Sequence, residues 1–352
     1  MMGSLAALFF LFNTGQLSRE KTKLVNTADA VAYSAGVMNA RALNFQAYTN
    51  RAMVANTVAI AQLVSLSSWV QYTNNLANYG WVLDNPKFAL FYPSYYGALY
   101  SGPYLQEYLI DSNALKDLAE TSDDIIQKVL INAQVVAYAG LIPARKQVMD
   151  DVAQANYHND GSVTVDPVPL TLNEFTSFVS RYSGDNRTRF AEVAKTSANR
   201  DSFVPKRSWL LPGLYSDCGG ATATGRVDFL TRRGGTELLG FDEWKAMDTL
   251  SEKRWVPKSK TDALCLAIAE TPAGWGLQAA LPQSSSDTLD LDPTHYDSSL
   301  PINPGSSGMA MLFSSSSWDY SGIPSFYDLS EDVLKHEEPR LQFAIRVRRD
   351  TS

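Results

Sequence analysis

Charged side chains are scarce in this chain, and over one long stretch they are almost missing. Asp, Glu, Lys and Arg make up 19% of its 352 residues, whereas soluble proteins use about 25%. From Ala30 to Leu83 the only ionisable charges belong to Arg41 and Arg51. Lys and Arg number 30 against 37 Asp and Glu, so the net charge is -7, which argues against general nucleic-acid binding.

Proline is also missing, from residues 5–79. A segment without a helix breaker and with so little charge predicts one continuous helix. At about 1.5 Å per residue this helix would reach about 110 Å, far more than the diameter of any domain that the chain could build. A helix that lacks a polar face needs burial on nearly every side. Its simplest partners are further copies of the same chain.

The residue types that build most catalytic centres are few. The three histidines lie far apart in the sequence, so neither a catalytic triad nor a histidine-based metal site is supported. The segment 305–308, Gly-Ser-Ser-Gly, lacks the spacing of a nucleophile elbow, and no phosphate-binding loop or dinucleotide fingerprint occurs. We therefore expect a protein that is not an enzyme and holds no cofactor or metal.

Two further features leave alternatives open. Cys218 and Cys265 are the only cysteines, and in an exported chain they could form a disulfide, with two free buried thiols as the alternative. A serine-rich loop, 283–325, carries an acidic series with oxygen ligands suited to calcium. Because this series lacks the glycine and the terminal glutamate of an EF-hand loop, a solvated acidic loop is favoured. The series comprises Asp287, Asp290, Asp292 and Asp297.

The chain starts with a short apolar run that includes Leu5, Leu8, Phe9 and Phe12. The run is shorter than the roughly 18 to 20 residues that span a bilayer as a helix. It also has neither the basic start nor the small-residue cleavage site of an intact signal peptide. It is either the processed remnant of a longer apolar segment or the start of an ordinary buried helix, and the first alternative suits an exported protein.

Small side chains recur at helical spacing farther along the same helix, and they let helix backbones approach closely. This stripe comprises Ala28, Ala32, Ala35 and Gly36, and it continues through Ala55 and Ala59. Arg41 and Arg51 lie within it. Because an unpaired buried charge is costly, we expect both arginines to pair with carboxylates or carbonyls, unless they extend into a wet groove.

Asparagine recurs through the helix as well. On a buried face it must find hydrogen-bond partners and then fixes the register between helices. The alternative is that these residues line the wetter face of a helix pair within one chain. They are Asn26, Asn39, Asn44, Asn50 and Asn56.

Beyond the long helix we distinguish two regions. Residues 1–80 form the assembly helix, 81–160 an aromatic connection and a second helical region, and 161–352 a globular head. The second helical region, 112–157, has an acidic wet face and is expected to lie back against the first, kinked or broken at Pro143.

The head is expected to contain an antiparallel sheet. Strict alternation over 341–348 predicts a half-exposed strand, and turns are predicted at 234–235 (Gly-Gly) and 272–274 (Pro-Ala-Gly). The predicted fold class is α+β: a very long N-terminal α-helix with a second antiparallel helix, followed by a globular head with an antiparallel sheet.

The first part of the helix resembles a known family. The segments Asn13-Thr14-Gly15-Gln16, Glu20-Lys21 and Ala28-Asp29-Ala30 resemble the N-terminal module of the TadE/TadG-like pilus-assembly family. The stretch from Arg41 to Asn56 looks like a longer branch of that group, and the resemblance covers about residues 5–70. Position 5 departs from the family pattern, since pilin-like subunits commonly carry a glutamate there and this chain has Leu5.

The resemblance implies an exported protein related to type IV pilins. One hypothesis is a pilin-like structural subunit of an extracellular, cell-surface filament. The subunit would form a helical homopolymer through its N-terminal helix, after a stage with the inner-membrane assembly machinery. The alternative is a membrane-anchored minor component of a pilus or secretion machine with its head in the periplasm. No nucleic-acid partner is expected for either.

Overall fold

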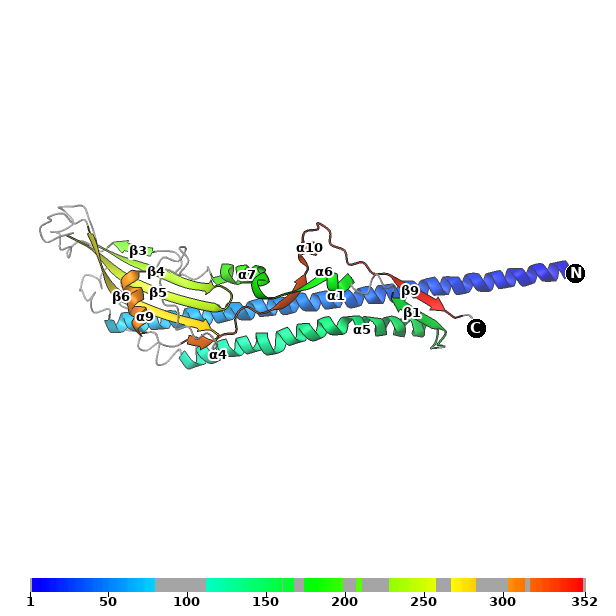
Figure 1. The fold of residues 1–352 in the computed structure, drawn as a ribbon, viewed down its shortest axis with the longest axis horizontal. Helices are drawn as coiled ribbons and strands as arrows, with labels where there is room; N and C mark the ends of the chain where they lie inside the picture. Colours follow the sequence, from blue (N-terminus) through cyan, green and yellow to red (C-terminus); the bar gives the residue numbers. More distant parts are fainter. Residues whose placement is uncertain are drawn as a thin grey trace. The chain divides into compact units, whose positions relative to one another are not determined.

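The chain folds as a mixed α+β protein whose elements appear in Figure 1. The computed structural model describes residues 2–79, 112–159, 161–167, 174–198, 207–210, 228–257, 267–282, 303–313 and 317–350. These residues belong to two compact units. The first comprises Met1–Ala52, Leu130–Gly184 and Ser325–Ser352, and the second comprises Met53–Val129 and Asp185–Pro324. Each unit therefore combines part of the long N-terminal helix with elements from later in the chain.

The predicted long helix is confirmed as α1 (Met2–Tyr79), which is unbroken over its whole length. The second helical region is also confirmed, as α4 (Ser112–Asp124), a π-helical stretch η3 (Ile125–Leu130) and α5 (Ile131–Asn156). Pro143 lies inside α5 and does not end it. Proline deprives the carbonyl four residues earlier of its hydrogen bond, and that residue, Ala139, is exposed, so water can take the bond instead.

In the first unit α1 and α5 form an antiparallel pair. Early residues of α1 contact late residues of α5, since Val31 and Ala35 pack with Met149 and Ala153. A ribbon of β1 (Val163–Pro167) and β9 (Ile345–Arg349) adds Val163 and Val165 to this core. Burial alternates along β9 as predicted from the sequence, although the strand is shorter than the predicted 341–348.

A second ribbon lies farther along the same helix pair. It consists of β2 (Val179–Tyr182) and β8 (Phe326–Leu329), with the short helices α6 (Glu174–Phe178) and α10 (Glu331–Leu334) beside it. Its core contains one buried residue each from α5, α6 and β2, and three partly buried residues of α1 pack against this core. The buried members are Leu141, Phe175 and Val179, and the α1 residues are Met38, Ala42 and Leu43.

The second unit is built on one five-stranded sheet. Its strand order is β3 (Arg207–Leu210), β4 (Phe229–Leu239), β5 (Glu243–Val256), β6 (Ala267–Leu281) and β7 (Ser317–Asp319). All neighbours are antiparallel except β6 and β7, which are parallel. A 3₁₀ turn, η5 (Gly184–Arg187), leads into α7 (Thr188–Ala198). The sheet is thus antiparallel, as expected for the head, except where β7 pairs with β6.

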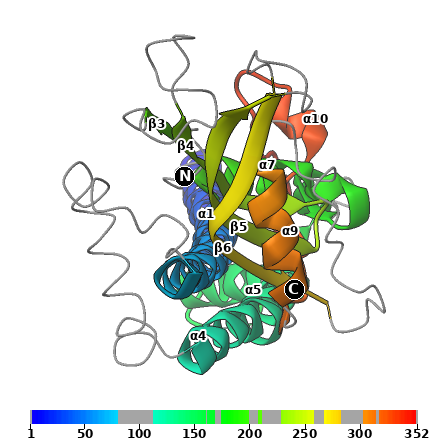
Figure 2. The same ribbon diagram turned by 90° about the vertical axis from the view of Figure 1, so that its left-hand side faces the viewer.

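Two helices cover opposite faces of this sheet, as Figure 2 shows for α1 and α9 (Pro304–Phe313). Alternation along β6 explains how each face fits its helix. The side chain of Trp275 packs in one core with Ala310 of α9. Gly276 faces α1, where a Cβ would collide with the carbonyl oxygen of Ser68. The glycine therefore allows the strand to touch the helix backbone.

Both predicted glycine turns are wrong for the same kind of reason. Residues 272–274 lie inside β6, where Ala273 is the extra residue of a β-bulge opposite Leu250 and Ser251. The pair 234–235 lies inside β4 at φ of 143° and 144°, and a Cβ on Gly234 would collide with the carbonyl oxygen of Met247 on β5. The turn itself comes later, at Gly240. In both places glycine permits close approach and not chain reversal.

The carboxylate of Glu270 anchors the start of α9 to the sheet. Its Oε1 accepts hydrogen bonds from the Ser251 hydroxyl and the Gly305 backbone N–H, both at 2.8 Å. Its Oε2 pairs with Lys253 on the neighbouring strand. Burial alone would raise the pKa of Glu270, but these three partners outweigh it and hold the pKa below its usual value.

We expect Gly276→Ala to destabilise the second unit, because the added methyl group overpacks the contact between β6 and α1. The loss should be about 1–3 kcal/mol or more in the free energy of unfolding, measured by denaturant titration of the full chain. Gly308→Ala is the matched control, since a Cβ there meets nothing within 4 Å and alanine favours the helix by about 0.5–1 kcal/mol. Equal effects of the two substitutions would contradict the close-approach role of Gly276.

The lowered pKa of Glu270 predicts a pH-dependent contribution to stability. Its charged form stabilises the fold above the pKa of the unfolded chain, and this contribution is lost as the pH falls through the folded value. Melting temperatures of wild type and Glu270→Gln should differ most near neutral pH and converge in acid. Glu338→Gln, at an exposed ion pair with Arg340, serves as the control. A difference for Glu270→Gln that is constant with pH would refute the role of its charge.

Candidate functional site

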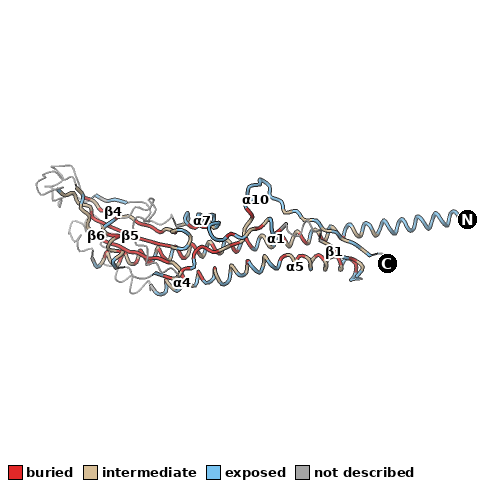
Figure 3. The backbone as a smooth tube through the Cα atoms, viewed as in Figure 1, coloured by how far each residue is buried: buried red, intermediate tan, exposed pale blue. Residues whose placement is uncertain are grey.

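The start of α1 exposes apolar side chains on all of its sides. We call residues 2–18 the apolar tip; its residues 5–12 are all apolar, and four of its last six residues are polar. Leu5, Leu8, Phe9 and Phe12 share one face of the helix and are each between 63% and 68% exposed, while Phe10 and Leu11 on its other sides are 69% and 70% exposed. Figure 3 shows this part of α1 as exposed, with burial beginning farther along the helix. A helix segment without a polar face requires an apolar environment around it.

The apolar tip also lacks charge, since the first ionisable side chain on α1 belongs to Arg19. Residues 2–18 extend for about 25 Å at 1.5 Å per residue. By length and composition α1 and the region Asn113–Asn156 are each capable of crossing a membrane, a criterion that the core helix of a soluble protein or a signal sequence also meets. The long apolar helix is thus weak evidence for a membrane anchor or a signal.

The stripe of small residues lies where α1 meets the rest of the first unit. Ala35 is fully buried against α5, and a Cβ on Gly36 would lie 4.0 Å from the ring of Phe343. Ala28 and Ala32 are half-buried. Ala35 and Gly36 of this stripe therefore pack against other parts of the same chain.

Arg41 and Arg51 are both exposed, and no ion pair joins either of them to another residue in the described part of the chain. Their exposure fits the alternative, in which both side chains extend into water, better than burial within an ion pair. Large aromatic side chains share their exposed face of α1, with Tyr33 at 76% and Tyr48 at 69% exposure. In the second unit, the predicted assembly residue Ala55 is exposed and Ala59 is half-buried.

A buried amide that the sequence did not single out holds the first unit together. Gln134 of α5 is fully buried, and its Nε2 donates to Thr49 Oγ1 and Asn50 Oδ1 of α1, both at 2.7 Å. Its Oε1 accepts from the backbone N–H of Tyr327 on β8 at 3.1 Å, while Asn50 Nδ2 donates to the Tyr327 carbonyl at 2.9 Å. We call this set of bonds the Gln134 clasp.

Asn39 makes a second polar bond between the same helices. Its Oδ1 accepts from Nη1 of the buried Arg145 at 3.2 Å. The guanidinium of Arg145 also lies 5.6 Å from the ring centroid of Phe343. Asn39 and Asn50 therefore fix helix register within one chain, and only their repeated occurrence in α1 signalled such a role.

Several expected features fall outside the described residues. These are Cys218, Cys265, the acidic series 287–297 and the aromatic connection that follows α1. The serines of segment 305–308 are described: Ser306 and Ser307 lie buried in the first turn of α9, where their hydroxyls bond to Leu250 and Asn303 backbone carbonyls. Among the residues that the structure describes, no group of three His, Cys, Asp or Glu side chains could hold a metal ion.

Comparison with known proteins finds no relative: no family model, no curated protein and no solved structure matches this chain.

We expect Gln134→Leu to destabilise the first unit because it leaves the Tyr327 N–H and the partners on α1 without their hydrogen bonds. Such buried losses cost about 1–3 kcal/mol for each unsatisfied group, measurable by denaturant titration. Amide exchange at Tyr327 should accelerate together with this loss. Asn44→Leu is the control, since Asn44 is exposed and surface substitutions stay within about 0.5 kcal/mol. Unchanged exchange at Tyr327 in Gln134→Leu would rule out the clasp.

Proposed function

We propose that this chain is a pilin-like structural subunit of an extracellular filament, assembled through its N-terminal helix. The exposure of the apolar tip carries this proposal. The side chains of Phe9, Phe10 and Leu11 point away from α1 in three different directions, so one flat contact cannot cover them. A bundle of tips from neighbouring subunits covers all sides at once, and it leaves the rest of each subunit outside the bundle.

The exposed face of α1 in the first unit favours protein partners over lipid. Tyr33 and Tyr48 share this face with Arg41 and Arg51. Tyrosine and arginine are enriched in protein–protein interfaces, whereas arginine at the centre of a bilayer is costly. Contact with a second subunit would bury the aromatic rings and give the arginines polar partners.

The resemblance of residues 5–70 to the TadE/TadG-like pilus-assembly family agrees with this proposal. It adds an export route in which the subunit first meets assembly machinery at the inner membrane and then becomes part of a cell-surface filament. The second candidate, a membrane-anchored minor component with a periplasmic head, is favoured by one observation: α1 is long and apolar enough to cross a membrane. The two candidates share the apolar tip and differ in what surrounds it.

The double variant Leu8→Asn, Phe12→Asn tests the filament. Burying an asparagine without hydrogen-bond partners costs about 2 kcal/mol or more, so two of them should reduce assembled fibres more than tenfold. The measurement is negative-stain microscopy and mass spectrometry of material sheared from the cell surface. Leu312→Asn is the matched control, because Leu312 is 78% exposed on α9 and lies outside the tip.

Normal amounts of fibre from the double variant would refute assembly through the tip. Recovery of the wild-type chain only in membranes, with none in sheared fibres, would instead favour the anchored component. Proteolysis of the exported chain should give the same fragments in wild type and in both variants, which shows that the substitutions leave the two compact units folded.

A further inference from the structure

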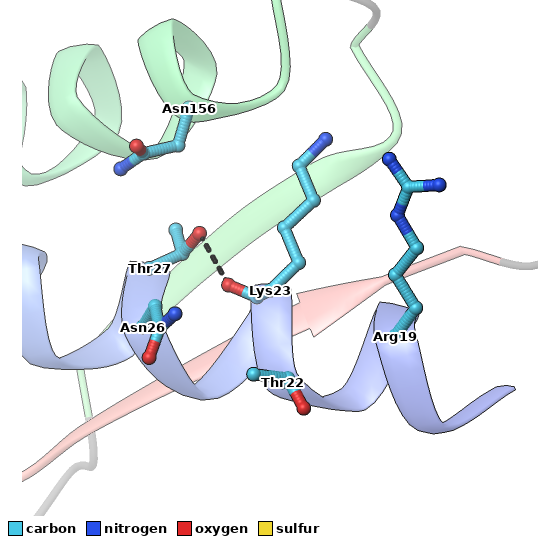
Figure 4. A pocket seen from close by; sticks show the side chains of 6 residues that line it. All are labelled: Arg19, Thr22, Lys23, Asn26, Thr27 and Asn156. Carbon is cyan, nitrogen blue, oxygen red and sulfur yellow. Dashed lines mark hydrogen bonds between the residues drawn. The ribbon is translucent and has the colours of Figure 1, made fainter. Parts of the chain in front are cut away.

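An open pocket of about 480 Å³ lies beside α1 directly after the apolar tip. Five of its lining residues belong to α1 and one to the last turn of α5, as Figure 4 shows. The lining residues are Arg19, Thr22, Lys23, Asn26, Thr27 and Asn156.

The pocket offers hydrogen-bond donors and positive charge. Arg19 and Lys23 are one helical turn apart and extend to the same side of α1 (Figure 4). Amide groups of Asn26 and Asn156 line the same space, and no carboxylate does. Arginine and lysine are the residues that bind phosphate, through charge-assisted hydrogen bonds.

Two contacts behind the pocket preserve its positive charge. The ammonium group of Lys23 lies 4.2 Å from the ring centroid of Tyr157, which holds this side chain in place. The nearest acidic residue in sequence, Glu20, pairs with Arg349 of β9. Arg349 itself lies 5.1 Å from the same tyrosine ring. The Glu20 carboxylate is thus engaged by another cation and leaves Arg19 and Lys23 available for an external anion.

The position of the pocket along α1 indicates the source of that anion. The apolar residues 5–12 are about 12 Å long, enough to enter one leaflet of a hydrocarbon core that is about 30 Å thick in all. The uncharged and mostly polar residues 13–18 then lie at the membrane surface, and Arg19 and Lys23 follow near the lipid phosphates. Basic residues at this level bind anionic head groups.

We propose that this pocket binds a phosphate group, supplied by the head group of an anionic phospholipid while the tip lies in the membrane. The inference rests on the proposed function to the extent that the subunit passes through a membrane stage before assembly. Arg19 and Lys23 bind the phosphate oxygens, and the amides of Asn26 and Asn156 donate further hydrogen bonds. The lipid would be exchanged for protein contacts when the subunit leaves the bilayer.

Native mass spectrometry of the full chain in a neutral detergent tests this site. The chain is titrated separately with phosphatidylglycerol, phosphatidylcholine and inorganic phosphate at constant ionic strength. We expect wild type to bind phosphatidylglycerol about tenfold more tightly than phosphatidylcholine. Arg19→Gln should weaken phosphatidylglycerol binding about fivefold, the effect of one basic residue near an anionic head group.

The matched control is Lys21→Gln, which removes the same charge from an exposed residue of α1 that does not line the pocket. It should change phosphatidylglycerol binding less than twofold. Lys23→Gln should act like Arg19→Gln, and its melting temperature reports whether loss of the Tyr157 contact disturbs the fold. Because Arg19 is exposed, Arg19→Gln tests the site even if Lys23→Gln does not fold.

Equal effects of Arg19→Gln and Lys21→Gln, or equal affinity of wild type for both lipids without phosphate binding, would overturn the proposal. Inorganic phosphate that binds wild type but not Arg19→Gln, without lipid selectivity, would retain the phosphate site and assign it a soluble ligand. Fibre microscopy and the lipid titration test the two proposals separately. Absence of fibres from wild type refutes the filament proposal alone, and the lipid titration tests only the phosphate pocket.

Discussion

The side-chain amide of Gln134 joins two helices and a strand of the first compact unit. Apolar contacts between α1 and α5 are non-directional, so on their own they specify the register only loosely. Hydrogen bonds are directional, and a buried donor or acceptor without its partner is costly. The Gln134 clasp and the bond between Asn39 and Arg145 therefore set one register. That register decides how much of α1 the chain covers and leaves the apolar tip exposed.

The sequence predicts features that local patterns determine, and it fails where contacts between distant residues decide. A long helix, a second helix against it and the β9 strand follow from local patterns: absence of proline, helical periodicity and strict alternation. The glycines were misread because a turn and a close approach have the same local signature. Only the neighbour, α1 for Gly274 and β5 for Gly234, decides between them, and it lies far away in the chain.

Burial of individual polar residues was equally hard to predict. Arg41 and Arg51 are conspicuous because their surroundings in the sequence are apolar, yet both are exposed, while Arg145 is buried. Which arginine is buried depends on the face that each helix turns toward the other. Nothing in the sequence around Gln134 marks it as a buried residue either. For the candidate site, the sequence correctly predicts that the tip is apolar. Whether the tip is exposed depends on the fold of the first unit.

The bonds to Tyr327 have a consequence for sheet formation. Its backbone N–H and C=O are both occupied by side chains of the helices, so this residue offers neither group to a strand from another chain. Open strand edges invite pairing between molecules and lead to aggregation. A protein with exposed ribbon edges needs protection against association through them. The two amides supply it at β8, so they restrict the ways in which copies of this protein can join.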